Sequence, residues 1–317
     1  MNQRGVSMIE QAMKIIEGRE PAKGKQRVIA VAGATASGKS ALAVEIAKRY
    51  GGEVISFDSM QIYKGMDIGT AKPTQSEMEG IPHHLIDFAD PKLPFSCADY
   101  AELAKAKIAE VASRRKLPVL CGGTGLYLDS VIAVSSLPDQ TGDPETRREL
   151  EAFAADLSPE QLHDVLRESD PESADKIHPH NVRRVVRAIE IFKFTGITKT
   201  EWDRRSKEAP SPYDATVIGI RYADRQKLYD RIDARVDIML QNGLLEEAKT
   251  LYESGALTPA GGGIQAIGYK ELIPHLNGKI TLEAAAEQIK QSTRNYAKRQ
   301  ITWFKAKGYV NWIEIGT

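Results

Sequence analysis

Short apolar runs, separated by polar turns and by segments of helical periodicity, organise much of this chain. The first run, Val28–Ala32, is continuously apolar and ends at a glycine, which is typical of a strand buried on both faces of a parallel sheet. A helix-periodic segment, Lys39–Tyr50, follows, and two more apolar runs come at Val54–Phe57 and Leu117–Cys121. Thr216–Ile220 is a fourth run of the same kind. Strands that alternate with helices predict an α/β fold with a parallel sheet.

The alternation stops between about Ser135 and Pro212. Charged helical segments interrupted by prolines replace the strands there, and after Ile220 the chain is again helical to about Lys307. We therefore predict an α/β core made of residues 28–134 and 213–317, the latter contributing C-terminal helices. Residues 135–212 are predicted to form a helical insertion domain.

Residues 1–27 have neither the long apolar run nor the small-residue cleavage site of a secretory signal. Met8, Met13, Ile15 and Ile16 fit the spacing of a short amphipathic helix. Terminal segments commonly fray, however. We expect residues 1–27 to be a loosely ordered N-terminal extension.

The composition is that of an ordinary globular protein, and it is mainly useful for excluding other classes of protein, such as membrane-spanning proteins. Of 317 residues, 42% are hydrophobic and 27% charged, and the formal net charge is zero. A nucleic-acid-binding face would therefore have to come from local clusters of Lys and Arg. No run approaches the ~18 apolar residues of a membrane span, and Cys97 and Cys121 have no metal-site spacing. We expect a cytoplasmic protein that does not bind membranes.

The strongest motif is Gly33-Ala-Thr-Ala-Ser-Gly38-Lys39-Ser40, which fits the P-loop pattern G-x-x-x-x-G-K-[ST] between a buried strand and a helix. The glycines allow several backbone N–H groups to point at one anion, and the helix N-terminus adds positive potential. Lys39 supplies a full charge, and the Ser40 hydroxyl is a candidate Mg²⁺ ligand. The pattern predicts a P-loop NTPase-like parallel sheet core that binds a di- or triphosphate. The residues predicted to bind it are Gly33, Thr35, Ala36, Ser37, Gly38, Lys39 and Ser40.

Two further polar positions follow predicted strands. Asp58 closes the second strand, and Gly122-Gly123-Thr124 follows the third, so both should lie beside the P-loop at the carboxyl edge of the sheet. Asp58 could be a base, a metal ligand or a Walker-B-like carboxylate, or only a turn former. Thr124 could equally cap the next helix. A small-molecule kinase would fit this pattern as well.

As a set, these motifs resemble the bacterial tRNA dimethylallyltransferases, which form the IPP transferase family. The resemblance extends from about Val28 to Trp312, nearly the whole chain, and is most specific between Asp58 and Pro73. The matching runs are Gly33–Ser40, Asp58–Pro73, Pro82–Asp87, Gly122–Tyr127, Ile267–Glu271 and Lys298–Phe304.

The resemblance implies a reaction. The P-loop would hold dimethylallyl diphosphate with Mg²⁺, and N6 of the adenine next to the anticodon, at tRNA position 37, would attack the allylic carbon and release diphosphate. It assigns Asp58 as the base that accepts the N6 proton. Thr124 becomes a hydrogen-bond partner in the same site, and Arg231 the arginine that contacts the diphosphate.

The resemblance also places the anticodon stem-loop of tRNA. The adenine has to leave its stack, and Ser59, Met60 and Gln61 would meet it; a Gln side chain can pair bidentately with adenine. Basic residues would bind the RNA, and the aromatics Tyr296, Trp303 and Phe304 are expected in the core. One cluster is Arg183, Arg184 and Arg187. The other is a stripe of Lys290, Arg294 and Lys298, extended by Arg299, in which Lys298 and Arg299 are the predicted RNA contacts. Arg147 is a weaker candidate for the same surface.

Some features depart from the family pattern, and other functions stay open. Ala34 stands where the family usually has Pro, and His180 interrupts the family's His-Pro-Asn-Asp run. The alternatives are an ATP-dependent small-molecule kinase, a prenyltransferase that acts on free AMP, ADP or ATP, and an idle RNA-binding protein. The two basic clusters favour tRNA over a free nucleotide. We expect a monomer.

Overall fold

The computed structural model describes residues 7–132, 144–208 and 211–316. The chain divides into two compact units, residues 1–128 with 212–317 and residues 129–211. The predicted boundary at residues 134–135 lies outside the described residues. We describe each unit by itself.

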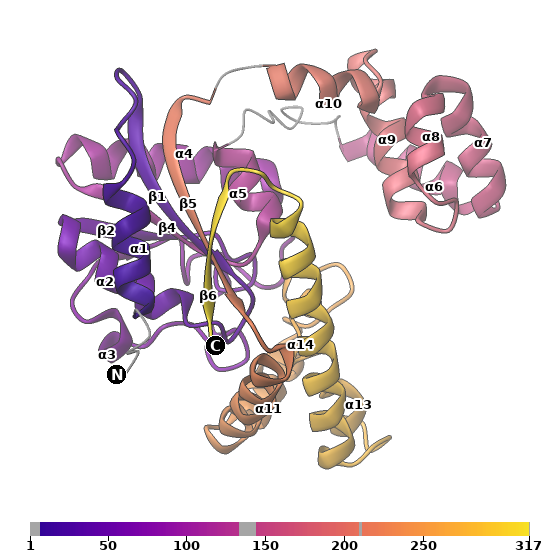
Figure 1. The fold of residues 1–317 in the computed structure, drawn as a ribbon. Coiled ribbons are helices and arrows are strands. Elements are labelled where there is room, and N and C mark those ends of the chain that lie inside the picture. Colours follow the sequence, from indigo (N-terminus) through magenta and orange to yellow (C-terminus); the bar gives the residue numbers. More distant parts are fainter. Residues whose placement is uncertain (1–6, 133–143, 209–210, 317) are drawn as a thin grey trace. The chain divides into compact units, whose positions relative to one another are not determined.

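A six-stranded sheet in which every strand pair is parallel forms the centre of the first unit (Figure 1). The strand order is β3-β2-β4-β1-β5-β6. All four predicted apolar runs fall on central strands, which are buried on both faces. The strands are β1 (Gln26–Gly33), β2 (Gly52–Ser56), β3 (His83–His84), β4 (Leu117–Gly122), β5 (Tyr213–Tyr222) and β6 (Val310–Ile315).

The sheet brings the predicted site segments to one edge. Ala32 on β1 is level with Gly122 on β4, and Ser56 on β2 is level with Cys121. Because the strands are parallel, their carboxyl ends open on the same side of the sheet. The P-loop, Asp58 and Thr124 all leave the sheet there, as predicted.

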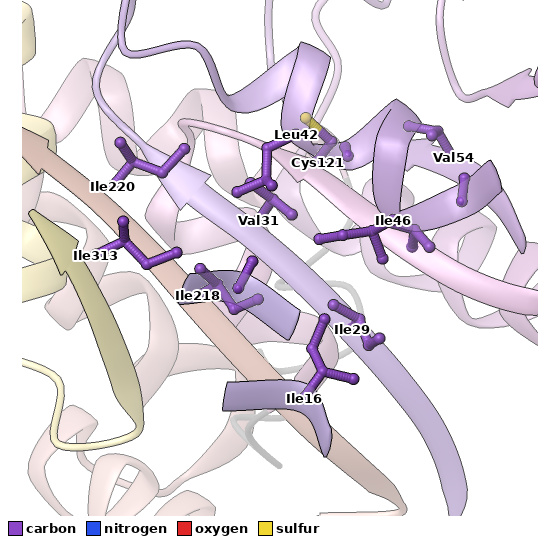
Figure 2. Packing of buried hydrophobic residues seen from close by; sticks show 14 of the residues in the cluster. Ile16, Ile29, Val31, Leu42, Ile46, Val54, Cys121, Ile218, Ile220 and Ile313 are labelled. Atoms are coloured by element: carbon purple, nitrogen blue, oxygen red, sulfur yellow. The ribbon is translucent and has the colours of Figure 1, made fainter. Parts of the chain in front are cut away.

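One face of the sheet is covered by α1 (Met8–Glu17) and α2 (Lys39–Tyr50). Ile16 of α1 is fully buried in one cluster with Ile29 of β1, Ile46 of α2 and Ile218 of β5 (Figure 2). The expectation that residues 1–27 are loosely ordered is therefore wrong for α1. Its apolar face supplies the packing energy that a frayed terminus lacks.

The N-terminal segment is also fixed beyond α1. The guanidinium of Arg19 lies 2.7 Å from the carboxylate of Asp214 on β5, and the Ala22 amide donates to the same carboxylate at 3.0 Å. Asp214 is 4% exposed, so its charge is compensated by these contacts.

Helix α4 (Cys97–Ser113) packs against β2 and β4. It begins at a capping box formed by Ser96 and Asp99. Its buried Tyr100 stacks on Tyr127 of α5 (Gly125–Ile132), with ring centroids 4.0 Å apart, and donates a hydrogen bond to the Ser56 carbonyl at 3.1 Å. This contact supports the end of β2, immediately before Asp58.

The His-His motif has a structural contact at the β3 edge. His84 Nε2 lies 2.7 Å from the carboxylate of Glu53 on β2, and Arg114 donates to the same carboxylate at 2.6 Å. Burial alone would raise the pKa of Glu53, but the hydrogen bonds from His84 and Arg114 outweigh it and lower that pKa. Glu53 therefore holds a short edge strand in place.

Most of the remaining helices of the first unit contribute to a second core beside the sheet, whereas α3 buries no residue. It includes Ile62, Val236, Leu244, Tyr269 and Ile289. Aspartates on α11 pair with cations on α14 and join these two helices. The helices are α3 (Gln75–Met78), α11 (Arg225–Gln241), α12 (Leu244–Glu253), the 3-10 helix η1 (Gly263–Gln265), α13 (Ile273–Leu276) and α14 (Leu282–Lys305).

The prediction for the C-terminus was incomplete. Helix α14 ends at Lys305, near the expected end, but the chain then forms the edge strand β6 beside β5. Strand β6 alternates between buried and more exposed positions and lacks the continuous apolar run of the central strands. In the part of the chain that the structure describes, no helix combines the length and apolarity needed to cross a bilayer.

The second unit is helical. Val185 and Ile189 of its helix α9 are buried in its core with Leu162, and Val182 and Val186 pack against that core. Its helices are α6 (Pro144–Ala155), α7 (Pro159–Ser169), α8 (Pro171–Lys176), α9 (Val182–Thr195) and α10 (Lys199–Glu208).

Candidate active site

The P-loop connects the central strand β1 to α2. Gly38 caps α2 with φ +90°, a left-handed conformation that a side chain would strain. In the part of the chain that the structure describes, no side chain caps this helix end. The first-turn amides therefore have no helical acceptor, and with the helix dipole they favour an anion.

Lys39 projects from this helix end into the same region. Its ammonium lies 3.4 Å from the Ala34 carbonyl, and no carboxylate in the described ranges lies within ion-pair distance. Burial lowers the pKa of Lys39, opposed by the nearby Cys121 and Asp58. A bound phosphate would supply the missing counter-charge.

A pocket of about 670 Å³ lies over the P-loop. Thr35, Ala36, Gly38, Lys39 and Ser40 line it, and their binding of a diphosphate stays a prediction. Gly33 and Ser37 do not line it; Ser37 is 2% exposed, and its hydroxyl has no hydrogen-bond partner among the described residues.

Two arginines of α11 reach this pocket. Arg231, predicted from the resemblance, donates from Nε to the Ala36 carbonyl at 3.1 Å. Arg235 was not predicted, although it lies one helical turn further on the same side. Its guanidinium is 3.5 Å from the Thr35 hydroxyl, and burial lowers its pKa against the opposing effect of Asp58.

Asp58 uses its two carboxylate oxygens differently. Oδ1 accepts the amides of Met60 at 3.0 Å and Gln61 at 3.4 Å, which makes Asp58 a turn former as well. Among the described residues, no hydrogen bond reaches Oδ2. One oxygen therefore orients the carboxylate and the other stays available to a substrate.

Thr124 joins the ends of β2 and β4. Its hydroxyl accepts the Ser59 amide at 3.0 Å and donates to the Ser59 hydroxyl at 3.1 Å. Tyr296 of α14 lies near Thr124 and Gln300. Burial, and then the charge of Asp58, raises the pKa of Tyr296 to about 12, so its hydroxyl stays protonated. Tyr296 lines a pocket beside Asp58, contrary to the expectation of core packing, whereas Phe304 is fully buried.

A second pocket, of about 370 Å³, adjoins the first. Thr35, Asp58, Thr70, Ala71, Arg235 and Met239 line both. Six aliphatic side chains form part of the wall of the second pocket: Met60, Ile232, Val236, Met239, Ile267 and Ile289. Asp58 thus borders both pockets: the first, called the cationic pocket, contains Lys39, Arg231 and Arg235. The second, called the apolar pocket, combines these aliphatic side chains with Arg235, Lys270 and Arg299.

The residues after Asp58 do not all face the same way. Ser59 and Met60 line the apolar pocket, whereas Gln61 lines the cationic one. The Gln61 amide nitrogen donates to the carbonyls of Thr70 at 3.3 Å and Ala71 at 3.1 Å. Because both of its N–H groups are used, the bidentate pairing with adenine that the sequence suggested would require these bonds to break.

Gln300 of α14 links two of the converging segments. Its Oε1 accepts the Thr35 amide at 2.9 Å, and its Nε2 donates to the Gly123 carbonyl at 3.0 Å. Gln300 lies within the Lys298–Phe304 run, but the resemblance assigns it no role. Only the fold brings it to the P-loop.

The predicted basic positions differ in their surroundings. On α14, Lys290 pairs with Asp237 at 2.7 Å and Arg294 pairs with Asp233 at 2.6 Å, so these two cations tie α14 to α11. Lys298 and Arg299 are exposed, and Arg299 also lines the apolar pocket. Among the described residues of the predicted basic stripe on α14, only Lys298 and Arg299 are therefore exposed without pairing to a carboxylate of α11.

In the helical unit, Arg183 and Arg184 are exposed on α9. Arg187 pairs with the buried Glu190 at 2.7 Å. The side chain of Arg147 lies outside the described residues.

These features define a class of protein: an α/β protein with a P-loop after its central strand and a carboxylate beside the phosphate pocket. The comparisons with known proteins narrow the class. The family model described as IPP transferase matches residues 61–307. The chain belongs to the IPP transferase family.

Similar proteins cover nearly the whole chain. The tRNA dimethylallyltransferase of Halalkalibacterium halodurans is 50% identical over 291 residues, 92% of each chain, and that of Caldanaerobacter subterraneus is 48% identical over 90% and 91%. A crystal structure of a Bacillus halodurans tRNA isopentenylpyrophosphate transferase is 48% identical, with a TM-score of 0.68, over 92% of this chain and 90% of that one. A eukaryotic dimethylallyltransferase acting on tRNA is 33% identical, with a TM-score of 0.80, over 91% and 74%.

Proposed function

We propose that this protein transfers the dimethylallyl group of dimethylallyl diphosphate to N6 of the adenine at tRNA position 37 and releases diphosphate. The observation that supports this most is the place of Asp58, on the wall shared by the cationic pocket over the P-loop and a pocket that several aliphatic side chains line. A phosphate ester fits the first pocket and a flat base or prenyl chain the second. Relatives that span the chain carry the name of this activity.

The cationic pocket binds the diphosphate and stabilises it as it leaves. Lys39, Arg231 and Arg235 surround this pocket, and the free amides of the α2 N-terminus face it. Negative charge grows on the diphosphate as the allylic C–O bond breaks. Preorganised cations and amides stabilise this charge more than they stabilise the starting ester.

Asp58 accepts the proton of the attacking amine. The N6 lone pair forms the bond to the allylic carbon, the C–O bond breaks, and an N6 proton passes to Oδ2. Thr124 holds the Ser59 segment next to Asp58, and Tyr296 supplies a protonated hydroxyl at the same place. General base catalysis of this kind contributes typically ~10²–10⁴-fold to a rate.

The donor set fits Mg²⁺ bound through the substrate. Ser40 presents an exposed hydroxyl at the cationic pocket. Within the described ranges, no group of three His, Cys, Asp or Glu side chains is arranged to hold a metal. Mg²⁺ commonly takes few protein ligands and several phosphate and water oxygens. The ion would neutralise diphosphate charge, with Ser40 as its protein ligand.

The tRNA substrate is proposed to contact two groups of cations. Arg183, Arg184 and Arg187 are on α9, and Lys298 and Arg299 are on α14; Arg147 is a further candidate. The exposed members are suited to phosphate contacts. Ser59 and Met60 would meet the extruded adenine at the apolar pocket, while Gln61 offers its Oε1. The monomeric state and the cytoplasmic location stay predictions.

An assay with three parallel reactions tests the proposal. Purified protein and Mg²⁺ are incubated with dimethylallyl diphosphate and unmodified tRNA, with dimethylallyl diphosphate and AMP, or with tRNA and ATP. Mass spectrometry of the digested RNA then detects prenylated adenosine. The proposal requires product in the first reaction alone; product from AMP would overturn the RNA substrate, and ATP consumption without prenylation would indicate a kinase.

A further inference from the structure

The loop from Asp67 to Lys72 forms part of both pockets. Thr70 and Ala71 line the cationic and the apolar pocket alike. Ala71 has φ +49°, a left-handed conformation that costs free energy for a residue with a side chain. The position of this loop therefore affects both pockets, and other contacts have to hold it.

Glu247, on the first turn of α12, binds the start of this loop. Its carboxylate accepts the backbone amides of Asp67 at 2.9 Å, Ile68 at 2.9 Å and Gly69 at 3.0 Å. It also accepts the hydroxyl of Tyr269 at 2.6 Å. Four donors on one ionised carboxylate are stronger than the same bonds to a neutral acceptor.

Tyr269 completes this anchor. The residue is fully buried, and burial, together with the charge of Glu247, raises its pKa, so the hydroxyl stays a donor. Gly69 lies against the ring: a Cβ there would be 2.5 Å from the ring carbons. The loop can approach Tyr269 this closely only because residue 69 is glycine.

The loop in turn positions Gln61. The carbonyls of Thr70 and Ala71 accept both N–H groups of the Gln61 amide, and Oε1 of Gln61 lies 3.4 Å from the Ser56 hydroxyl. The Gln61 backbone amide contacts Oδ1 of Asp58. A continuous series of hydrogen bonds therefore runs from Glu247 through the loop and Gln61 to Asp58.

We propose that Glu247, with Tyr269, is a positioning residue for the transfer reaction. It fixes the 67–71 loop and so holds Gln61 and Asp58 in the geometry that the acceptor amine needs. This inference rests on the proposed function. Replacing one carboxylate oxygen with an amide NH₂ sets a donor against the loop amides, so the loop has to move.

The test compares Glu247→Gln with Glu246→Gln, which changes the same charge at an exposed neighbour on the same helix turn. We expect Glu247→Gln to lower kcat for tRNA prenylation by roughly tenfold or more, as expected from the loss of charge-assisted hydrogen bonds. The Kd for inorganic diphosphate, measured by calorimetry, should change by less than about threefold, because the P-loop and the arginines carry that binding. Glu246→Gln should match the wild type in both measurements.

A double-mutant cycle with Gln61→Ala separates positioning from general stability. If Glu247 acts through Gln61, the loss caused by Glu247→Gln becomes much smaller in the Gln61→Ala background. Additive losses, or a wild-type kcat for Glu247→Gln, overturn the proposal. If Glu247→Gln does not fold, Tyr269→Phe is the replacement variant, because it removes only one hydrogen-bond donor from the Glu247 carboxylate. Tyr269→Phe should lower kcat without changing the Kd for diphosphate. No prenylation by the wild type would instead refute the proposed function.

Discussion

At the residue scale, the side chain of Asp58 has a structural and a chemical part. Oδ1 closes a turn with Met60 and Gln61, and Oδ2 accepts no hydrogen bond from the described residues. A substitution that keeps the turn but removes the charge should therefore separate the two parts.

Asp58→Asn makes that separation. The amide oxygen can still accept the Met60 amide, so the fold and tRNA binding should stay unchanged. We expect kcat to fall by ~10²–10⁴-fold, the range of general base catalysis. Single-turnover prenylation and a filter-binding Kd for tRNA measure the two quantities. A near-normal kcat would remove Asp58 from the role of base.

Arg235 gives a second prediction at this scale. Its guanidinium lies between Thr35 and the Asp58 region, and burial costs it part of its hydration. Arg235→Gln should weaken inorganic diphosphate binding by about tenfold or more, the effect of one lost charge-assisted contact. Arg225→Gln, at an exposed position on the same helix, is the matched control. Equal Kd values for the two variants would contradict this role.

At the element scale, the sequence specifies best what neighbours along the chain decide. The P-loop, the central strands and the Ser96 capping box follow from local patterns, and the structure agrees with them. The helical spacing of α1 was visible, but its order was not expected, and strands β3 and β6 were not predicted. The stability of these elements comes from contacts with distant segments, such as Ile16 against β1 and β5. The residues of the candidate site likewise fall into those that local patterns predict and those that only the fold brings together.

Local motifs gave the P-loop residues and placed Asp58 and Thr124 at one edge, and Arg231 came from the resemblance alone. Arg235, Tyr296, Gln300 and Glu247 were missed. These four residues come from the C-terminal half of the chain and act on loops up to 265 positions away. No pattern along the chain predicts such a contact.

The Glu53 cluster tests how the β3 edge is held. Glu53→Gln should lower the free energy of unfolding at pH 7 by about 2–3 kcal/mol, less than the ~3–5 kcal/mol of a fully buried pair because Arg114 is 42% exposed. The folded-state pKa of Glu53 is lowered, so its stabilisation is full above the unfolded-state value and is lost as the pH falls through the folded-state pKa. Urea unfolding at pH 7 and at pH 3 should show a smaller difference at pH 3. If Glu53→Gln lowers the free energy of unfolding by the same amount at both pH values, the stabilisation does not come from the ionised Glu53 carboxylate.

At the scale of the whole molecule, the net charge is zero, but the cations differ in whether a carboxylate pairs with them. Lys290, Arg294 and Arg187 are paired with carboxylates, whereas Arg183 and Arg184 are exposed on α9. The exposed pair has more freedom to contact RNA phosphates. This contrast between paired and exposed cations was not visible in the sequence.

Reversal of Arg183 and Arg184 to Glu tests this surface. We expect tRNA binding to weaken, and the slope of log K against log salt to become shallower by ~1–2, because about 0.7–0.9 counterions are released per phosphate contact. Lys105→Glu with Lys116→Glu changes the net charge equally at exposed positions of the first unit. If both double variants weaken binding alike, the effect is one of net charge and α9 is not the contact surface.

The most direct test of the central claim is the site and stoichiometry of transfer on one anticodon stem-loop. Isotope-labelled dimethylallyl diphosphate, the wild-type protein and a stem-loop with adenine at position 37 are incubated together, and the RNA fragments and released diphosphate are measured. The account predicts one label on N6 of that adenine for each diphosphate released, and almost none with Asp58→Asn. Diphosphate release without labelled adenine, or label on another base, would contradict it.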